Sequence, residues 1–219
     1  MPMPIYARFL NQIYHSADHL YEVLSKHPYC VDPESNFFLH QFEGLALHCN
    51  HFAERNGLRL DIDNRFVDLA NSIKHIRNVP ERQISLQSAI LFEINNNGEY
   101  RFIRNTILGK YINIQESEEF DAIEEMHHVI LSYIPILDKA IEPLEITESI
   151  YPFYDRGFGY IDPILSVHNR GTRINTVMKS PTGYIRSNPV YRKFALLNAS
   201  VIGKDPTLYF EAPEATFLP

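Results

Sequence analysis

The chain has 219 residues, of which 45% are hydrophobic and 21% charged, as is usual for a globular protein with a core of its own. No apolar run approaches the roughly 20 residues of a membrane-spanning helix, and the first residues are amphipathic rather than typical of a secretory signal. The two cysteines, Cys30 and Cys49, are too few for a disulfide framework and predict reduced thiols in a cytoplasmic protein.

The net charge of −7 is unevenly distributed along the chain. Residues 1–150 hold 22 acidic and 12 basic residues, net −10, whereas residues 151–219 hold 5 acidic and 8 basic residues, net +3. A basic end on an acidic body can bind an anion, or it can pair with that body or with a second subunit.

Apolar residues recur at helical spacing in four stretches, which predicts amphipathic helices. Gly57 ends the second helix, Pro80 ends the third, and Pro135 kinks or divides the fourth. The helices are expected at residues 4–26, from Asp32 or Ser35 to 56, at 65–77 and at 118–141.

Some histidines on these helices have the spacing of metal ligands. His15 and His19 are one turn apart, and His48-x-x-His51-x-x-Glu54 follows on the second helix. Neither set has the further ligands that a metal site needs, and solvated helix faces have the same pattern. We therefore expect no metal and no other cofactor.

A hairpin is expected between the third and fourth helices, at about residues 84–108. Apolar and polar residues alternate up to Ile94, and Asn95-Asn96-Asn97-Gly98 supplies the turn.

From Pro143 onward prolines, glycines and tyrosines become frequent, which predicts an extended region with short strands near 174–178 and 191–197. Its basic residues are interleaved with aromatic ones, as on surfaces that bind single-stranded nucleic acid. The alternative is that this region packs on the acidic helices by charge complementarity. The candidate phosphate contacts are Arg170, Arg173, Lys179, Arg186, Arg192 and Lys193.

The third helix carries the candidate catalytic site. Asp68, Asn71 and His75 fall on the face opposite its apolar stripe, and Lys74 lies beside them. An acid and an amide near an imidazole can orient the ring for proton transfer. The alternative interpretation is a solvated polar face.

The run from Asp68 to His75, a D-x-A-N-x-x-K-H helix followed by a basic residue and a hairpin, resembles an uncharacterised bacterial family of HEPN-like helical domains over about residues 11–133. The resemblance implies a helical domain that binds or cuts RNA in a toxin–antitoxin or phage-defence system. The usual HEPN nuclease signature, an arginine and a polar residue with a histidine four to six residues further on, is not found: Arg55, Arg77 and Arg104 are each followed by Asn but lack the histidine.

We therefore expect an α+β fold, mainly α, with a helical bundle and inserted hairpin over residues 1–142 and a basic extended region over residues 143–219. The first functional hypothesis is an RNA- or nucleotide-directed protein, including a metal-independent RNase in which Asp68, Asn71, Lys74 and His75 form the site. His75 would then move the proton, and Lys74 or an arginine would stabilise the charged intermediate. The second is a non-catalytic interaction or assembly subunit whose C-terminal region binds a protein partner or a second copy. Neither hypothesis involves a membrane.

Overall fold

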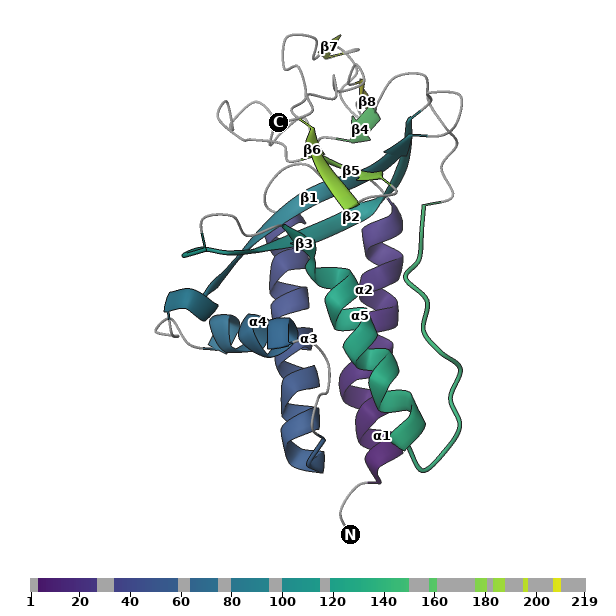
Figure 1. The fold of residues 1–219 in the computed structure, drawn as a ribbon. Coiled ribbons are helices and arrows are strands. Elements are labelled where there is room, and N and C mark those ends of the chain that lie inside the picture. Colours follow the sequence, from purple (N-terminus) through teal and green to yellow (C-terminus); the bar gives the residue numbers. More distant parts are fainter. Residues whose placement is uncertain are drawn as a thin grey trace. The chain divides into compact units, whose positions relative to one another are not determined.

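The computed structural model describes helices, strands and connecting segments of an α+β fold in which helices hold more residues than strands (Figure 1), so the expected fold class is confirmed. The described residues are 4–26, 34–58, 64–74, 80–94, 100–114, 119–149, 158–160, 176–180, 183–187, 195–196 and 207–209. The chain forms two compact units: unit 1 comprises residues 1–22, 38–87 and 107–146, and unit 2 comprises residues 23–37, 88–106 and 147–219. The sequence-based division at residues 142/143 stays a prediction.

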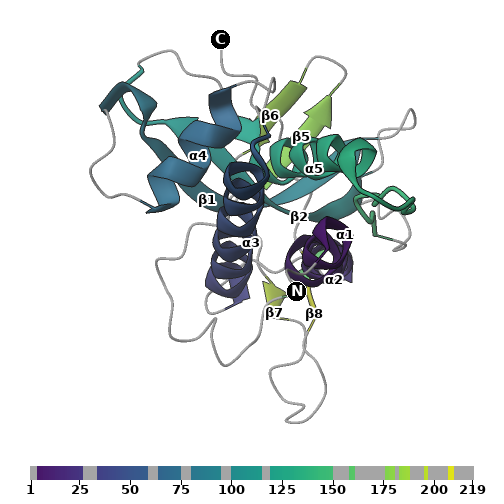
Figure 2. The same ribbon diagram turned by 90° about the horizontal axis from the view of Figure 1, so that it is seen from below.

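Unit 1 contains most of the helical residues. The first predicted helix is observed as α1 (Ile5–Phe9), a π-helical stretch (Leu10–Tyr14) and α2 (His15–Lys26), which follow one another without a break. The later helices are α3 (Glu34–Asn56), α4 (Asn64–Lys74) and α5 (Ala122–Tyr133). In Figure 1, α2 runs beside α3 and α5, and α4 lies across α3; Figure 2 shows the same helices from below. No helix in the described part of the chain is long and apolar enough to cross a membrane.

The fourth helix is shorter at both ends than the sequence pattern predicts. Phe120 and Asp121 form the short strand β3 (Phe120–Asp121), and the Asp121 carboxylate then caps α5 by accepting hydrogen bonds from the backbone N–H groups of Ile123 (2.9 Å) and Glu124 (3.3 Å). At the other end a 3-10 turn containing Pro135 follows Tyr133, because proline cannot continue the hydrogen-bond ladder.

The predicted apolar stripes meet in the core of unit 1, where three aromatic rings from α1, α3 and α5 pack together. The ring centroid of Phe52 lies 5.7 Å from that of Phe9 and 5.1 Å from that of Tyr133. The Tyr133 hydroxyl donates a 2.9 Å hydrogen bond to the Cys49 carbonyl, which satisfies both buried groups. These contacts tie α1, α3 and α5 into one core.

Cys49 is a free thiol that is fully buried in this core, and burial raises its pKa above the ordinary value. In a variant with Cys30→Ser, we expect the Cys49 thiol to react with an aromatic disulfide reagent at pH 8 only after unfolding. In the folded protein the reagent cannot reach the buried sulfur, and burial disfavours the reactive thiolate form. Absorbance of the released thiolate with and without urea measures this. Native-state labelling as fast as that of the unfolded chain would contradict the buried placement.

The predicted hairpin is confirmed as β1 (Ile84–Ile94) and β2 (Tyr100–Tyr111), and both strands run through the division between the units. In unit 1 the strand order is β3-β2-β1. Strand β3 pairs antiparallel with the end of β2, with Gly109 opposite Phe120. A Cβ on Gly109 would lie within 2.6 Å of the ring atom Cε2 of Phe120, so this close pairing requires glycine.

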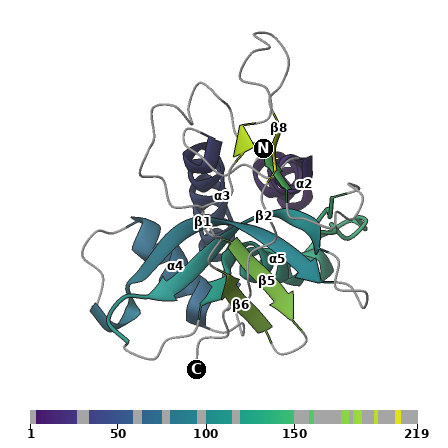
Figure 3. The same ribbon diagram turned by 90° about the horizontal axis from the view of Figure 1, so that it is seen from above.

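Unit 2 contains the remaining strands, of which Figure 3 labels β5, β6 and β8. Its strand order is β2-β1-β5-β6, with β5 (Thr176–Ser180) parallel to β1 and β6 (Gly183–Ser187) antiparallel to β5. A second sheet has the order β4-β8-β7 and is formed by β4 (Phe158–Tyr160), β8 (Thr207–Tyr209) and β7 (Ala195–Leu196). The expected short strands thus occur in the C-terminal region.

Polar side chains are buried inside unit 2 as well. Arg104 is 2% exposed, and its Nη1 donates a 2.6 Å hydrogen bond to Thr106 Oγ1. The neighbouring Asn105 donates to the carbonyl of Leu24 (3.0 Å), and the Ser149 backbone N–H donates to the carbonyl of Ile103 (2.7 Å). Arg104 is therefore part of the interior of unit 2 and not a surface cation.

Candidate functional site

The candidate site lies at α4, in unit 1. Phe66, Leu69 and Ala70 on this helix are buried, as their spacing predicts. Asp68 is also buried, although it lies on the side opposite the apolar stripe. Segments that follow α4 in the sequence therefore cover its polar side at Asp68. The alternative interpretation of a solvated polar face is wrong for this residue.

Two side chains from other segments hold the Asp68 carboxylate. The Tyr111 hydroxyl, at the end of β2, donates a 3.2 Å hydrogen bond to Asp68 Oδ2. Arg82, in the 3-10 turn Pro80–Arg82, places its Nε 3.3 Å from Asp68 Oδ1. This second contact is an ion pair without hydrogen-bond alignment, because Oδ1 accepts no hydrogen bond. The Asp68 side chain is 6% exposed and that of Arg82 is 51% exposed, so a buried anion holds a half-exposed cation.

Ser72 fixes the backbone around this ion pair. Its hydroxyl donates a 2.7 Å hydrogen bond to the Asp68 carbonyl one turn earlier and accepts a 3.0 Å hydrogen bond from the Ile84 N–H, at the start of β1. The Arg82 carbonyl lies 3.3 Å from the same oxygen. The turn that carries Arg82 is thereby held against α4, close to Asp68.

Arg65, at the start of α4, is occupied by other partners. Its Nη1 donates a 2.7 Å hydrogen bond to Glu125 Oε1 on α5, and its guanidinium carbon lies 4.9 Å from the ring centroid of Phe120. These contacts link α4 to α5 and β3. Arg65 is thus held by Glu125 and Phe120, whereas Asp68 pairs with Arg82.

Of the predicted catalytic residues, Asp68, Asn71 and Lys74 lie on α4, with Asn71 half-buried and Lys74 exposed in the last turn. His75 lies outside the described residues. The structure joins Asp68 to Arg82 and Tyr111, which the sequence analysis did not connect with it. Ser72 could have been found from its i+4 spacing to Asp68, whereas Tyr111 is 43 residues from Asp68 and has no such signal.

Two of the predicted phosphate contacts fall in described strands. Lys179 is exposed on β5, opposite Tyr184 of β6. Arg186 pairs through its backbone with Val177, and its side chain is outside the described part of the structure. The remaining four lie outside the described residues and stay predictions: Arg170, Arg173, Arg192 and Lys193.

Within the residues that the structure describes, no three His, Cys, Asp or Glu side chains are grouped so that they could hold a metal ion. The functional group that the structure places beside α4 is the Arg82 guanidinium, paired with Asp68. No family model, curated protein or solved structure matches the chain.

Proposed function

We propose that the protein is an RNA- or nucleotide-directed protein that contacts phosphate through Arg82. The observation that supports this proposal is the unequal exposure of the Asp68–Arg82 ion pair. Asp68 contacts the inner Nε of the guanidinium, and the side chain is half-exposed, so the terminal amino groups are available to an anion. Two parallel N–H donors match the oxygens of a phosphate. A guanidinium that is already held in place loses less side-chain entropy when it binds.

Lys74 is a second cation for the same anion. It is exposed in the last turn of α4. In the proposal Lys74 and Arg82 contact successive phosphates, and the C-terminal basic residues extend the contact surface. Asp68 is then a positioning residue for Arg82.

Metal-independent cleavage by His75 is part of the same proposal. His75 directly follows Lys74, and an imidazole can both accept and donate a proton near neutral pH. The D-x-A-N-x-x-K-H helix supports membership of a HEPN-like family, with a role in a toxin–antitoxin or phage-defence system.

Replacement of Arg82 by glutamine is expected to weaken the binding of single-stranded RNA about tenfold, because one charge-assisted phosphate contact is lost. It should also lower the slope of log affinity against log salt by about 0.7, the value for one phosphate on a single strand. Filter binding of labelled RNA across a salt series measures both quantities.

The matched control is Arg55→Gln, which removes an exposed arginine in the last turn of α3. Equal losses in the two variants would show a diffuse charge effect and contradict a site at Arg82.

The same preparations test cleavage: RNA cutting that survives EDTA and disappears in His75→Ala supports His75 as the catalytic group. Binding without cutting would reject the catalytic part alone.

A second candidate function, a protein-interaction or assembly subunit, is favoured by two exposed isoleucines directly after β2. Ile112 and Ile114 are 53% and 44% exposed. Exposed large apolar side chains close together are typical of surfaces that bind another protein. A stable protein complex that is lost in an Ile112→Ser/Ile114→Ser variant, together with no affinity for RNA, would favour this function over the first.

A further inference from the structure

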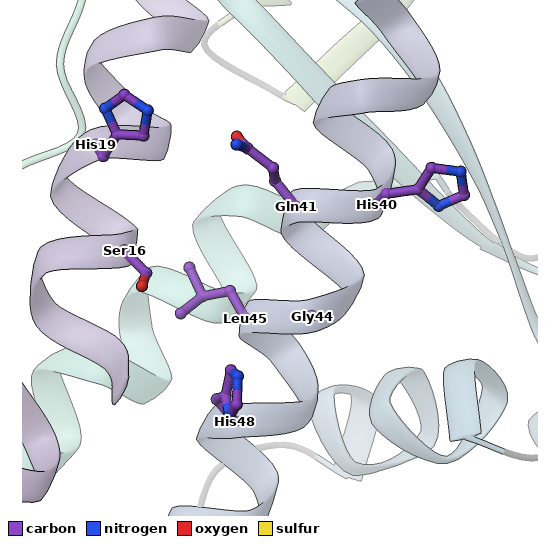
Figure 4. A pocket seen from close by; sticks show the side chains of 7 residues that line it. All are labelled: Ser16, His19, His40, Gln41, Gly44, Leu45 and His48. Carbon is purple, nitrogen blue, oxygen red and sulfur yellow. The ribbon is translucent and has the colours of Figure 1, made fainter. Parts of the chain in front are cut away.

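A groove between α2 and α3, in unit 1, is separate from the Asp68–Arg82 pair. Its volume is about 280 Å³, just below the roughly 300–1,000 Å³ of small-molecule sites. None of the described residues that line it is an acid, a lysine or an arginine. They are Ser16, His19, His40, Gln41, Gly44, Leu45 and His48 (Figure 4).

Gly44 lies in the middle of the 23-residue helix α3, where glycine costs about 1 kcal/mol relative to alanine. A Cβ at Gly44 would meet no atom within 4 Å. Close packing against a neighbour therefore does not require glycine at this position. What the missing side chain does provide is open space along the groove.

Gln41 supplies an unused hydrogen-bond acceptor. Its Oε1 is buried and has no hydrogen-bond partner in the described part of the structure. Figure 4 shows the Gln41 side chain pointing from α3 toward α2. A buried acceptor without a partner costs about 1–3 kcal/mol, and a ligand that brings an N–H or O–H group recovers this energy.

The rest of the lining is suited to a flat ligand without charge. His19 on α2 and His48 on α3 contribute imidazole rings, which stack on heteroaromatic faces, and Leu45 adds an apolar contact. Ser16 on α2 adds a hydroxyl. The ring of His40 pairs instead with Glu43 (Nδ1 to Oε2, 3.2 Å) and points away from α2 (Figure 4), so His40 lies at the edge of the groove.

We propose that the groove between α2 and α3 binds a nucleobase that carries an amino group, with Gln41 Oε1 accepting a hydrogen bond from that group. The base lies over Gly44, where the missing side chain leaves room, and contacts His19, His48 and Leu45. The site recognises the base and needs no phosphate, so it does not depend on Arg82.

The test uses the full chain and two nucleosides that differ in one group: adenosine, which has the amino group, and purine riboside, which lacks it. We expect adenosine to bind about tenfold more tightly, as measured by NMR titration, because purine riboside leaves the Gln41 acceptor unpaired. Gln41→Leu should remove this difference. Equal binding of both nucleosides to the unchanged protein, or binding of neither, overturns the proposal.

Gly44→Leu should abolish adenosine binding, since the added side chain fills the groove. This variant is expected to fold, because leucine has a higher helix propensity than glycine and the space is open. Gly44→Ala gains helix propensity with little loss of volume and should retain most of the binding. Unchanged affinity in Gly44→Leu would place the nucleoside elsewhere and overturn the proposal.

Arg82→Gln separates this inference from the proposed function. It should leave adenosine binding unchanged, because adenosine has no phosphate. Loss of RNA affinity in Arg82→Gln with adenosine binding retained supports the two sites independently. Loss of both RNA and adenosine affinity would contradict a nucleoside site that is independent of Arg82.

Discussion

Replacement of Phe52 by alanine is expected to lower the free energy of unfolding by about 3–5 kcal/mol, the usual cost of removing a buried phenyl ring. Phe52 is 2% exposed and contacts aromatic rings from two other helices, at centroid distances of 5.7 Å to Phe9 and 5.1 Å to Tyr133. The cavity would thus open where α1, α3 and α5 meet. Urea unfolding followed by far-ultraviolet circular dichroism is the appropriate measurement, since the chain has no tryptophan.

Phe37→Ala is the matched control for this prediction, because it removes the same side chain at a position on α3 that is 53% exposed. We expect a change of no more than about 0.5 kcal/mol there. Similar, small losses in both variants would mean that the aromatic core of unit 1 is not packed as described.

Replacement of Asp68 by alanine is expected to lower the free energy of unfolding by about 2 kcal/mol and to weaken RNA binding about tenfold. The stability loss follows from the hydrogen bond to Tyr111, since bonds to a charged group contribute about 1.5–3 kcal/mol. The ion pair adds little because the Arg82 side chain is 51% exposed. The affinity loss follows because Arg82 no longer has a fixed position.

Asp68→Asn separates the two effects. The amide can still accept from the Tyr111 hydroxyl but carries no charge for Arg82, so we expect a smaller loss of stability and the same loss of RNA affinity. The double variant Asp68→Asn/Arg82→Gln should bind RNA no more weakly than Arg82→Gln alone, because both changes remove one contact. Additive losses in filter binding would contradict the role of Asp68 as a positioning residue.

The two sites proposed for unit 1 recognise different parts of a nucleotide. Arg82 offers charge-assisted donors, which suit phosphate, whereas the groove between α2 and α3 offers an amide oxygen, two imidazoles and a neutral lining. A protein with both could combine salt-dependent affinity with a preference among bases. Each part can be tested alone, with phosphate-free nucleosides for the groove and a salt series for Arg82.

Much of the fold could be predicted from local patterns. The helical stripes on the first three helices, the break at Gly57 and the alternation in β1 all depend on neighbours a few residues apart, and the structure confirms them. Gly57 has the positive φ of 64° that favours glycine at the end of a helix. The start of α5 at Ala122 could not be predicted in this way, because Phe120 and Asp121 are extended by their pairing with β2.

The sequence by itself determined where the helices and the hairpin form, because hydrophobic periodicity and backbone-breaking residues act over one or two turns. It also selected Asp68 as a residue of interest. Only the tertiary structure decided that Asp68 is buried, that Arg82 and Tyr111 are its partners, and that Gln41 and Gly44 face a groove beside α2. These relations join residues far apart in the chain, and helical periodicity specifies which face a side chain occupies but not what covers that face.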